Sequence, residues 1–133
     1  LKVDKIIQAY GNKNRIPLSF PGGYMGATGK IFSIVIPGLT HDYNCMMNSL
    51  DNKVNEYKMY KSINSISGFT LSSFASVADF ISSISSFEII KYFTGEMRPY
   101  LINKVLHFNF RNYTIDEIEI DNRSCSCFEK QPV

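Results

Sequence analysis

The sequence contains no tryptophan, only three cysteines and almost no excess of charge. Fourteen lysines and arginines against twelve acidic residues leave a net charge of +2 at pH 7. A nucleic-acid surface needs clustered basic side chains to neutralise phosphates, so this balance predicts no nucleic-acid partner. No apolar run approaches the ~18 residues of a membrane-spanning helix, and we therefore expect no membrane partner.

The length and composition bound the number of domains. The chain has 133 residues, of which 44% are hydrophobic and 20% charged, so it can form a packed core. This length excludes a multidomain enzyme. Because the first residue is not methionine, we expect residues 1–133 to be a single, partial domain whose preceding part holds further chemistry.

The cysteines favour a reducing environment. Cys45, Cys125 and Cys127 are odd in number, and a Cys-Ser-Cys tripeptide cannot close on itself without strain. Secreted disulfide scaffolds normally carry more cysteines, in even number. We therefore predict a cytoplasmic protein whose thiols are free or bound to a metal.

Hydrophobic spacing predicts the elements of the first part of the chain. Apolar residues at spacings of three and four predict a short helix over 3–10, which Gly11 ends. A short strand follows over 16–20, at an edge or with its start at its proline. Four glycines in eight positions predict a loop over 21–29. The nearly continuous apolar run 30–36 predicts a strand covered on both faces.

A long polar stretch separates this part from the next helix. Residues 39–68 have no sustained hydrophobic period, and we expect a functional loop within them, a crossover-like segment over 51–67. The clearest helical pattern then covers 72–94, with a wide apolar stripe that suggests burial against a sheet or a partner subunit. Ser72 or Ser73 can cap its start and Gly95 its end.

The end of the chain predicts a pair of strands. Residues 104–110 alternate between apolar and polar, residues 113–120 alternate less cleanly, and Arg111-Asn112 between them suits a two-residue turn. The acidic residues of the second strand suggest a solvated face. The predicted fold class is therefore α/β: a mixed sheet with a long buried helix and a C-terminal antiparallel hairpin.

The glycine-rich segment does not carry a phosphate-binding motif. A P-loop requires a glycine, four residues, and then Gly-Lys-Ser/Thr. Here Gly29-Lys30 is followed by Ile31, and Tyr24 occupies the position of the first glycine. A dinucleotide fingerprint also fails, because a strand rather than a helix follows. The spacing favours a plain connection between strands.

The cysteines are candidate zinc ligands. Cys45, Cys125 and Cys127 would give four tetrahedral ligands together with Asp42 or His41, if the end of the chain folds back beside the segment after residue 36. The alternative is three buried or surface thiols without metal. We expect the other histidine, His107, to be a half-buried strand residue, and nothing places a nucleophile near either imidazole ring.

The order of these features resembles the second half of the ThiF/MoeB/HesA family, the E1-like adenylating enzymes. The resemblance rests on the collinear set Ile16-Pro17, the glycine turn, Pro37-Gly38, Asp42-x-x-Cys45, the helix end Phe87–Gly95, the hairpin and Cys125-Ser126-Cys127. It covers nearly the whole chain. The departures are Asp42 at the place of the first zinc cysteine and the shortened final Cys-x-Cys, so the site either keeps zinc or has lost its metal.

The resemblance implies a function that this chain serves in part. Family members use ATP and magnesium to adenylate the C-terminal carboxylate of a ubiquitin-like sulfur carrier protein or a peptide, usually as homodimers. Their nucleotide-binding and catalytic residues precede the region present here, so no catalytic residue is carried over. We expect this segment to supply scaffold, dimer contacts and substrate-tail surface. The alternative is a non-catalytic peptide-binding module of a ribosomal-peptide-modifying system.

Overall fold

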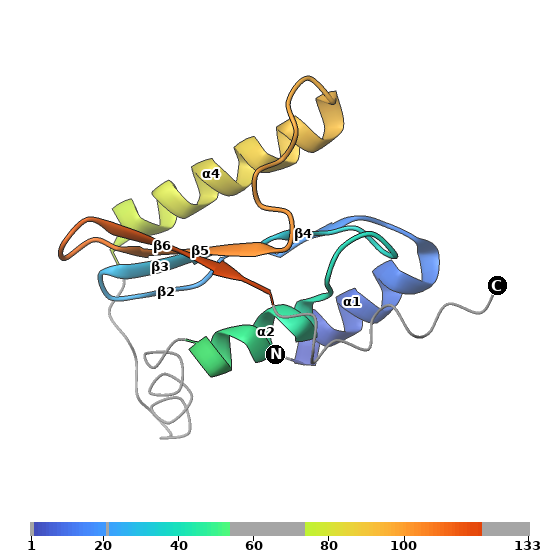
Figure 1. Ribbon diagram of the computed structural model, residues 1–133, viewed down its shortest axis with the longest axis horizontal. Coiled ribbons are helices and arrows are strands. Elements are labelled where there is room, and N and C mark those ends of the chain that lie inside the picture. The colour runs from blue at the N-terminus through green and yellow to red at the C-terminus, as the bar shows by residue number, and fades with distance from the viewer. Residues whose placement is uncertain (1, 21, 54–73, 121–133) are drawn as a thin grey trace.

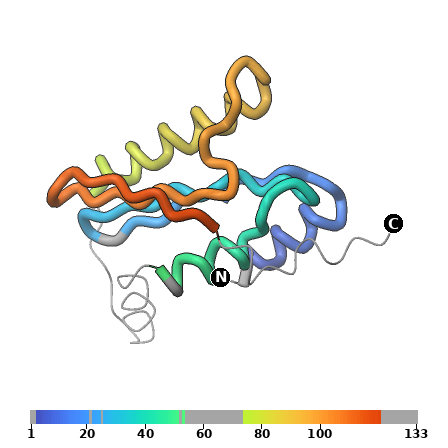
Figure 2. Tube along the Cα trace, viewed as in Figure 1, coloured from blue at the N-terminus to red at the C-terminus, as the bar shows by residue number. Residues whose placement is uncertain are grey.

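The computed structural model describes residues 2–20, 22–53 and 74–120. The described elements form three layers, in which the strands lie between α4 on one side and α1 and α2 on the other (Figures 1 and 2). The helices are α1 (Lys2–Asn14), α2 (Tyr43–Lys53) and α4 (Ala75–Thr94). The strands are β1 (Leu18–Ser19), β2 (Tyr24–Met25), β3 (Thr28–Ile31), β4 (Ile34–Val35), β5 (Lys104–Asn109) and β6 (Thr114–Glu119). The predicted α/β class, with its long helix and C-terminal hairpin, is confirmed, but the described strands pair only antiparallel where a mixed sheet was predicted.

The described strands form two sheets. One has the order β2-β3-β5-β6 and the other is the pair β1-β4, and every described pair is antiparallel. The predicted hairpin is β5–β6, with Val105 opposite Ile118. Its turn is longer than predicted, because Asn109 and Thr114 are the last paired residues and Tyr113 adopts a φ of 58°.

The prediction that Gly11 ends the first helix is wrong. Helix α1 continues through Gly11 to Asn14, and Arg15 then takes a left-handed φ of 55°. Gly11 instead permits close packing, since a Cβ there would lie 2.5 Å from Cδ1 of Leu18. A side chain here would have to displace that of Leu18, and the helix tolerates the weak propensity of glycine.

The glycine-rich segment contains strands where a loop was predicted. Strands β2 and β3 form a hairpin in it, and Gly26 takes the left-handed φ of 55° at the turn. The single strand predicted over 30–36 is also interrupted, because β3 ends at Ile31 and β4 begins at Ile34. Between them Ser33 is buried, and its hydroxyl donates a hydrogen bond to the carbonyl of Leu101 at 2.8 Å.

The prediction of irregular structure over 39–68 is wrong for α2. Asp42 caps this helix by accepting a hydrogen bond from the N–H of Cys45 at 2.9 Å. The N–H of Tyr43 donates to Oε1 of Gln8 in α1 at 3.0 Å, which satisfies a second free amide of the first turn. Residues 54–67 of the predicted crossover-like loop lie outside the described residues.

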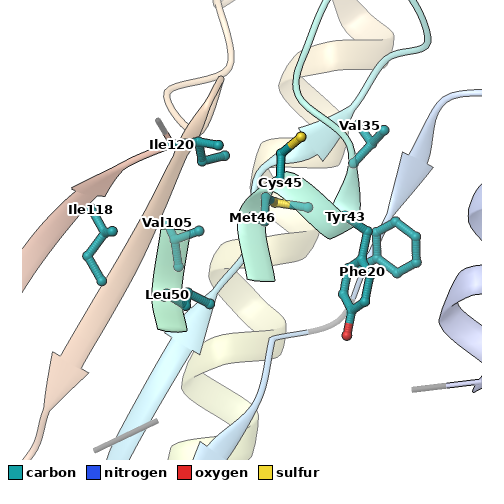
Figure 3. Close-up of a cluster of buried hydrophobic side chains, with 9 residues drawn as sticks. All are labelled: Phe20, Val35, Tyr43, Cys45, Met46, Leu50, Val105, Ile118 and Ile120. Atoms are coloured by element: carbon teal, nitrogen blue, oxygen red, sulfur yellow. The ribbon is translucent and has the colours of Figure 1, made fainter. Parts of the chain in front are cut away.

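Two hydrophobic clusters lie on the opposite faces of the strands. The cluster facing α2 is shown in Figure 3 and consists of Phe20, Val35, Tyr43, Cys45, Met46, Leu50, Val105, Ile118 and Ile120. The cluster facing α4 consists of Ile31, Val77, Ile81, Leu101 and Phe108. Alternation along β5 feeds both, since Val105 faces α2 and Phe108 faces α4.

Helix α4 buries only part of its apolar stripe. Val77, Ile81 and Glu88 are its buried residues, whereas Phe93 is 77% exposed. The predicted end at Gly95 is confirmed, with a φ of 69° and a hydrogen bond from its N–H to the carbonyl of Lys91. Ser72 and Ser73, the predicted caps, lie outside the described residues. The predicted burial of the whole stripe therefore does not occur within the described part of the chain.

Candidate functional site

A buried glutamate begins a chain of hydrogen bonds that runs from α4 to the start of α2. Glu88 is only 4% exposed, and its Oε2 accepts the N–H of Leu101 at 2.8 Å. Its other oxygen lies 2.5 Å from Nζ of Lys91, one turn further along α4. The sequence pattern treated Glu88 as part of an ordinary charged helix end, and that interpretation is wrong.

The chain of hydrogen bonds continues through Ser33 and Asn103. The hydroxyl of Ser33 donates to the carbonyl of Leu101 and accepts the N–H of Asn103 at 3.0 Å. Oδ1 of Asn103 in turn accepts the N–H of His41 at 2.8 Å. Asn103 has a φ of 57°, a conformation that asparagine tolerates better than most residues. Three segments far apart in the sequence are thereby fixed together.

The turn after β4 positions His41. The N–H of Ile36 donates to Oγ1 of Thr40 at 2.7 Å, and the Thr40 hydroxyl donates to the carbonyl of Ile34 at 3.2 Å. Gly38 supplies the left-handed φ of 82° that the turn requires. These bonds lead the chain from the strand pair directly into α2.

A polar cavity of about 210 Å³ lies where these segments meet the ends of β5 and β6. It is lined by His41, Ile102, Asn103, Lys104, Glu119 and Ile120. His41 is 3% exposed, so its position is set by its surroundings and not by solvent. The cavity combines hydrogen-bond donors and acceptors with groups of both charges, which is the chemistry that orients a small polar ligand or a chain end.

A second set of polar residues lies beside the cavity and consists of Lys104 of β5, Glu117 of β6 and Tyr100, which precedes β5. The hydroxyl of Tyr100 donates a hydrogen bond to Glu117, and Nζ of Lys104 lies 3.0 Å from the other oxygen of that carboxylate. These two donors lower the pKa of Glu117, Tyr100 contributing more than Lys104. The carboxylate in turn raises the pKa of Tyr100 and of Lys104, mainly through the same hydrogen bonds. The cluster thus holds Glu117 ionised.

The structure describes three of the predicted metal ligands. Cys45 lies in the first turn of α2, Asp42 immediately precedes the helix, and His41 precedes Asp42. One oxygen of Asp42 is already engaged as the helix cap, and Cys45 is disulfide-bonded, although a free or metal-bound thiol was expected. Within the described ranges no three histidine, cysteine or acidic side chains form a metal-binding group. Cys125 and Cys127 lie outside those ranges, so the zinc site stays a prediction.

Some residues of this site left only weak signals in the sequence. Ser33 interrupts an otherwise apolar run, which is a sign that the strand breaks there. Asn103 precedes a strand and is a residue type that accepts a positive φ. Glu88 gave no such sign, because its burial depends on the segment around Leu101 folding back onto α4.

The remaining sequence-based expectations for polar residues agree with the structure. His107 lies in β5 as expected, although it is buried and not half-buried, and its Nδ1 lies 3.7 Å from a carboxylate oxygen of Asp116. Asp116 and Glu117 are exposed on opposite faces of β6, as alternation predicts. None of the helices within the described ranges has the length and apolarity needed to span a membrane.

Comparison with known proteins gives structural neighbours only. No protein-family model and no curated protein sequence matches the chain. MccB of E. coli is similar with a TM-score of 0.74 and 20% identity, over 98% of this chain and 37% of the MccB chain. The complex of MccB with the peptide MccA is similar with a TM-score of 0.71 and 21% identity, over 96% of this chain and 36% of the MccB chain. PaaA is similar with a TM-score of 0.70 and 15% identity, over 91% of this chain and 40% of the PaaA chain.

These similarities establish the E1-like fold. MccB and PaaA are E1-like adenylating enzymes, and the agreement extends over nearly all of this chain. A specific place among ThiF, MoeB and HesA does not follow from identities of 15–21%. The chain spans little more than a third of the length of these neighbours.

Proposed function

We propose that this chain is the C-terminal portion of an E1-like enzyme that uses ATP to adenylate the C-terminal carboxylate of a peptide. The observation that carries the proposal is the fold match to MccB, which covers 98% of this chain but 37% of MccB. Other MccB structures contain ATP or the peptide MccA, and MccB is described as a microcin C7 biosynthetic enzyme. These neighbours favour a peptide substrate over the ubiquitin-like carrier protein that the sequence left equally open.

In this proposal the chain supplies scaffold and substrate surface, and the nucleotide is bound elsewhere. The glycine-rich segment is a β-hairpin and not a phosphate-binding loop before a helix, which supports a nucleotide site outside this segment. The polar cavity beside His41 and Lys104 has the groups needed to orient a peptide end. In the reaction itself, a carboxylate oxygen of the peptide attacks the α-phosphorus of ATP and pyrophosphate leaves. Zinc, magnesium, a homodimer and a cytoplasmic location belong to this proposal as predictions.

Exposed apolar side chains also support a role within a larger assembly. Val3, Ile6 and Tyr10 of α1 are each more than half exposed, as is Phe93 of α4. Exposed apolar side chains that gather along one face of a helix, as Val3, Ile6 and Tyr10 do, usually mark an interface. Helix α1 turns Asp4 and Gln8 toward α2 and leaves its apolar side uncovered by the described residues.

The test is ATP–pyrophosphate exchange with matched peptides. The full-length polypeptide containing this chain should exchange pyrophosphate in the presence of a peptide with a free C-terminal carboxylate, such as MccA, and not with its C-terminal amide. The 133-residue chain alone should show no exchange with either. Exchange by the isolated chain would contradict the placement of the nucleotide site, and binding of the peptide without any exchange by the full polypeptide would favour the non-catalytic peptide-binding module.

A further inference from the structure

Cys45 is bonded to another sulfur atom in the first turn of α2. The residue is disulfide-bonded and only 3% exposed, and it belongs to the hydrophobic cluster that faces α2 (Figure 3). The sequence has two other cysteines, Cys125 and Cys127, and both lie outside the described residues. A disulfide within this chain therefore uses one of these two and leaves the third cysteine as a thiol.

The end of β6 brings the chain close to Cys45. Ile120, which follows β6, belongs to the same hydrophobic cluster as Cys45, and its N–H donates to the carbonyl of Asn103 at 3.0 Å. His41, which lies shortly before Cys45 in the sequence, lines the polar cavity together with Ile120. Cys125 follows Ile120 closely in the sequence, and an extended segment of that length spans up to about 18 Å. The Cys-x-Cys pair can therefore reach Cys45.

The surroundings of Cys45 favour a neutral disulfide over a charged thiolate. The other members of its cluster, among them Val35 and Met46, are hydrophobic and buried. Burial among apolar side chains disfavours the thiolate, which is the form of cysteine that binds zinc. Oδ1 of Asp42 is also occupied, since it accepts the N–H of Cys45 at 2.9 Å. A disulfide and a zinc–thiolate bond exclude each other at this sulfur atom, so closing the disulfide removes Cys45 from the predicted zinc ligands.

We propose that Cys45 and one cysteine of Cys125-Ser126-Cys127 form a reversible disulfide that ties the end of the chain to the first turn of α2, beside the polar cavity. Closing the bond removes two protons and two electrons from the two thiols. Oxidised glutathione, or another small disulfide, accepts them and becomes two thiols. Cys125 and Cys127 do not pair with each other instead, because a disulfide across a single residue is strained.

Counting the cysteines that stay outside the disulfide tests the pairing. The 133-residue chain is equilibrated with oxidised and reduced glutathione, quenched with acid, unfolded and treated with a maleimide. Mass spectrometry then counts maleimide and glutathione adducts, each of which marks one cysteine outside the disulfide. The oxidised wild-type chain should carry one adduct, and the fully reduced chain should carry three. Cys45→Ser should carry two, and at least one of Cys125→Ser and Cys127→Ser should carry none. After trypsin, peptide 31–53 should be joined to peptide 124–130 in the wild-type chain.

Urea unfolding and amide exchange measure what the disulfide does to the fold. Reduction of the wild-type chain should lower the urea midpoint by about 1–2 M, because the bond closes a long loop of the unfolded chain. Exchange of the N–H groups of His41 and Cys45, which are bonded to Asn103 and Asp42, should become at least about tenfold faster. Cys45→Ser is the matched control, and the reductant should change neither quantity in it.

Several outcomes would overturn the proposal. They are three adducts on the oxidised wild-type chain, no adducts on Cys45→Ser, a dimer held by a disulfide between two copies, or an unchanged urea midpoint on reduction. The peptide map uses the wild-type chain, so it decides the pairing even where a serine variant does not fold. No nucleotide or substrate peptide enters these measurements, so their outcome is independent of the proposed function.

Discussion

Replacing Glu88 by alanine tests the hydrogen-bonded chain that connects α4 to the polar cavity. The substitution removes the acceptor of the Leu101 N–H and the partner of Lys91, both in a largely water-excluded place. A buried donor without an acceptor costs about 1–3 kcal/mol, and breaking a buried ion pair costs about 3–5 kcal/mol. Lys91 keeps some contact with water, its side chain being 14% exposed, so the lower values apply. We expect Glu88→Ala to lower the free energy of unfolding by about 3 kcal/mol.

Two further variants separate the hydrogen bond from the charge. Glu88→Gln keeps an oxygen that accepts the Leu101 N–H and should cost less than Glu88→Ala, by about 1–2 kcal/mol. Glu96→Ala removes an exposed glutamate near the end of the same helix and should change stability by no more than about 0.5 kcal/mol. Urea unfolding, followed by the circular dichroism of the helices at about 222 nm, gives the free energy of unfolding of all three variants. Equal stability of Glu88→Ala and Glu96→Ala would refute the assignment.

The remaining predictions concern backbone space, pH and metal. Gly22→Ala should destabilise the chain by about 2 kcal/mol or more, because its Cβ meets the Lys30 carbonyl, whereas Gly23→Ala, with open space around it, should be nearly neutral in urea unfolding. The pKa of Glu117 is lowered in the folded state, so its contribution to stability is present above the ordinary pKa of about 4.3 and is lost as pH falls through the folded pKa. The difference in unfolding free energy between the wild-type chain and Glu117→Gln should therefore shrink from neutral pH to about pH 3. A difference that does not change with pH would contradict this prediction. If the chain purified under reducing conditions contains zinc, Cys45→Ser should remove it by mass-spectrometric metal analysis, and unchanged zinc would exclude Cys45 as a ligand.

Some elements could be predicted because their patterns are local. The apolar spacing of α4, the glycine that ends it and the alternation of β5 and β6 all act over a few residues, and each was found where expected. Helix α2 was missed although Tyr43, Met46 and Leu50 lie at helical spacing, because the helix has only 11 residues and its first turn is stabilised by Asp42 and by Gln8 of a distant helix. Hydrophobic spacing along the chain indicates neither of these hydrogen bonds.

The sequence by itself determined the order of the main elements and the E1-like resemblance, because propensity, glycine positions and hydrophobic period are properties of neighbouring residues. Only the tertiary structure decided that Glu88 is buried, that Ser33 breaks a strand and that Asn103 meets His41. The hydrogen bonds of Ser33 with Leu101 and of Asn103 with His41 join residues more than sixty positions apart. Their energy depends on which polar groups folding removes from water. The cavity that Ser19 and Tyr24 line together with Ile81 and Ile89 of α4 likewise exists only because segments far apart in the chain come together in space.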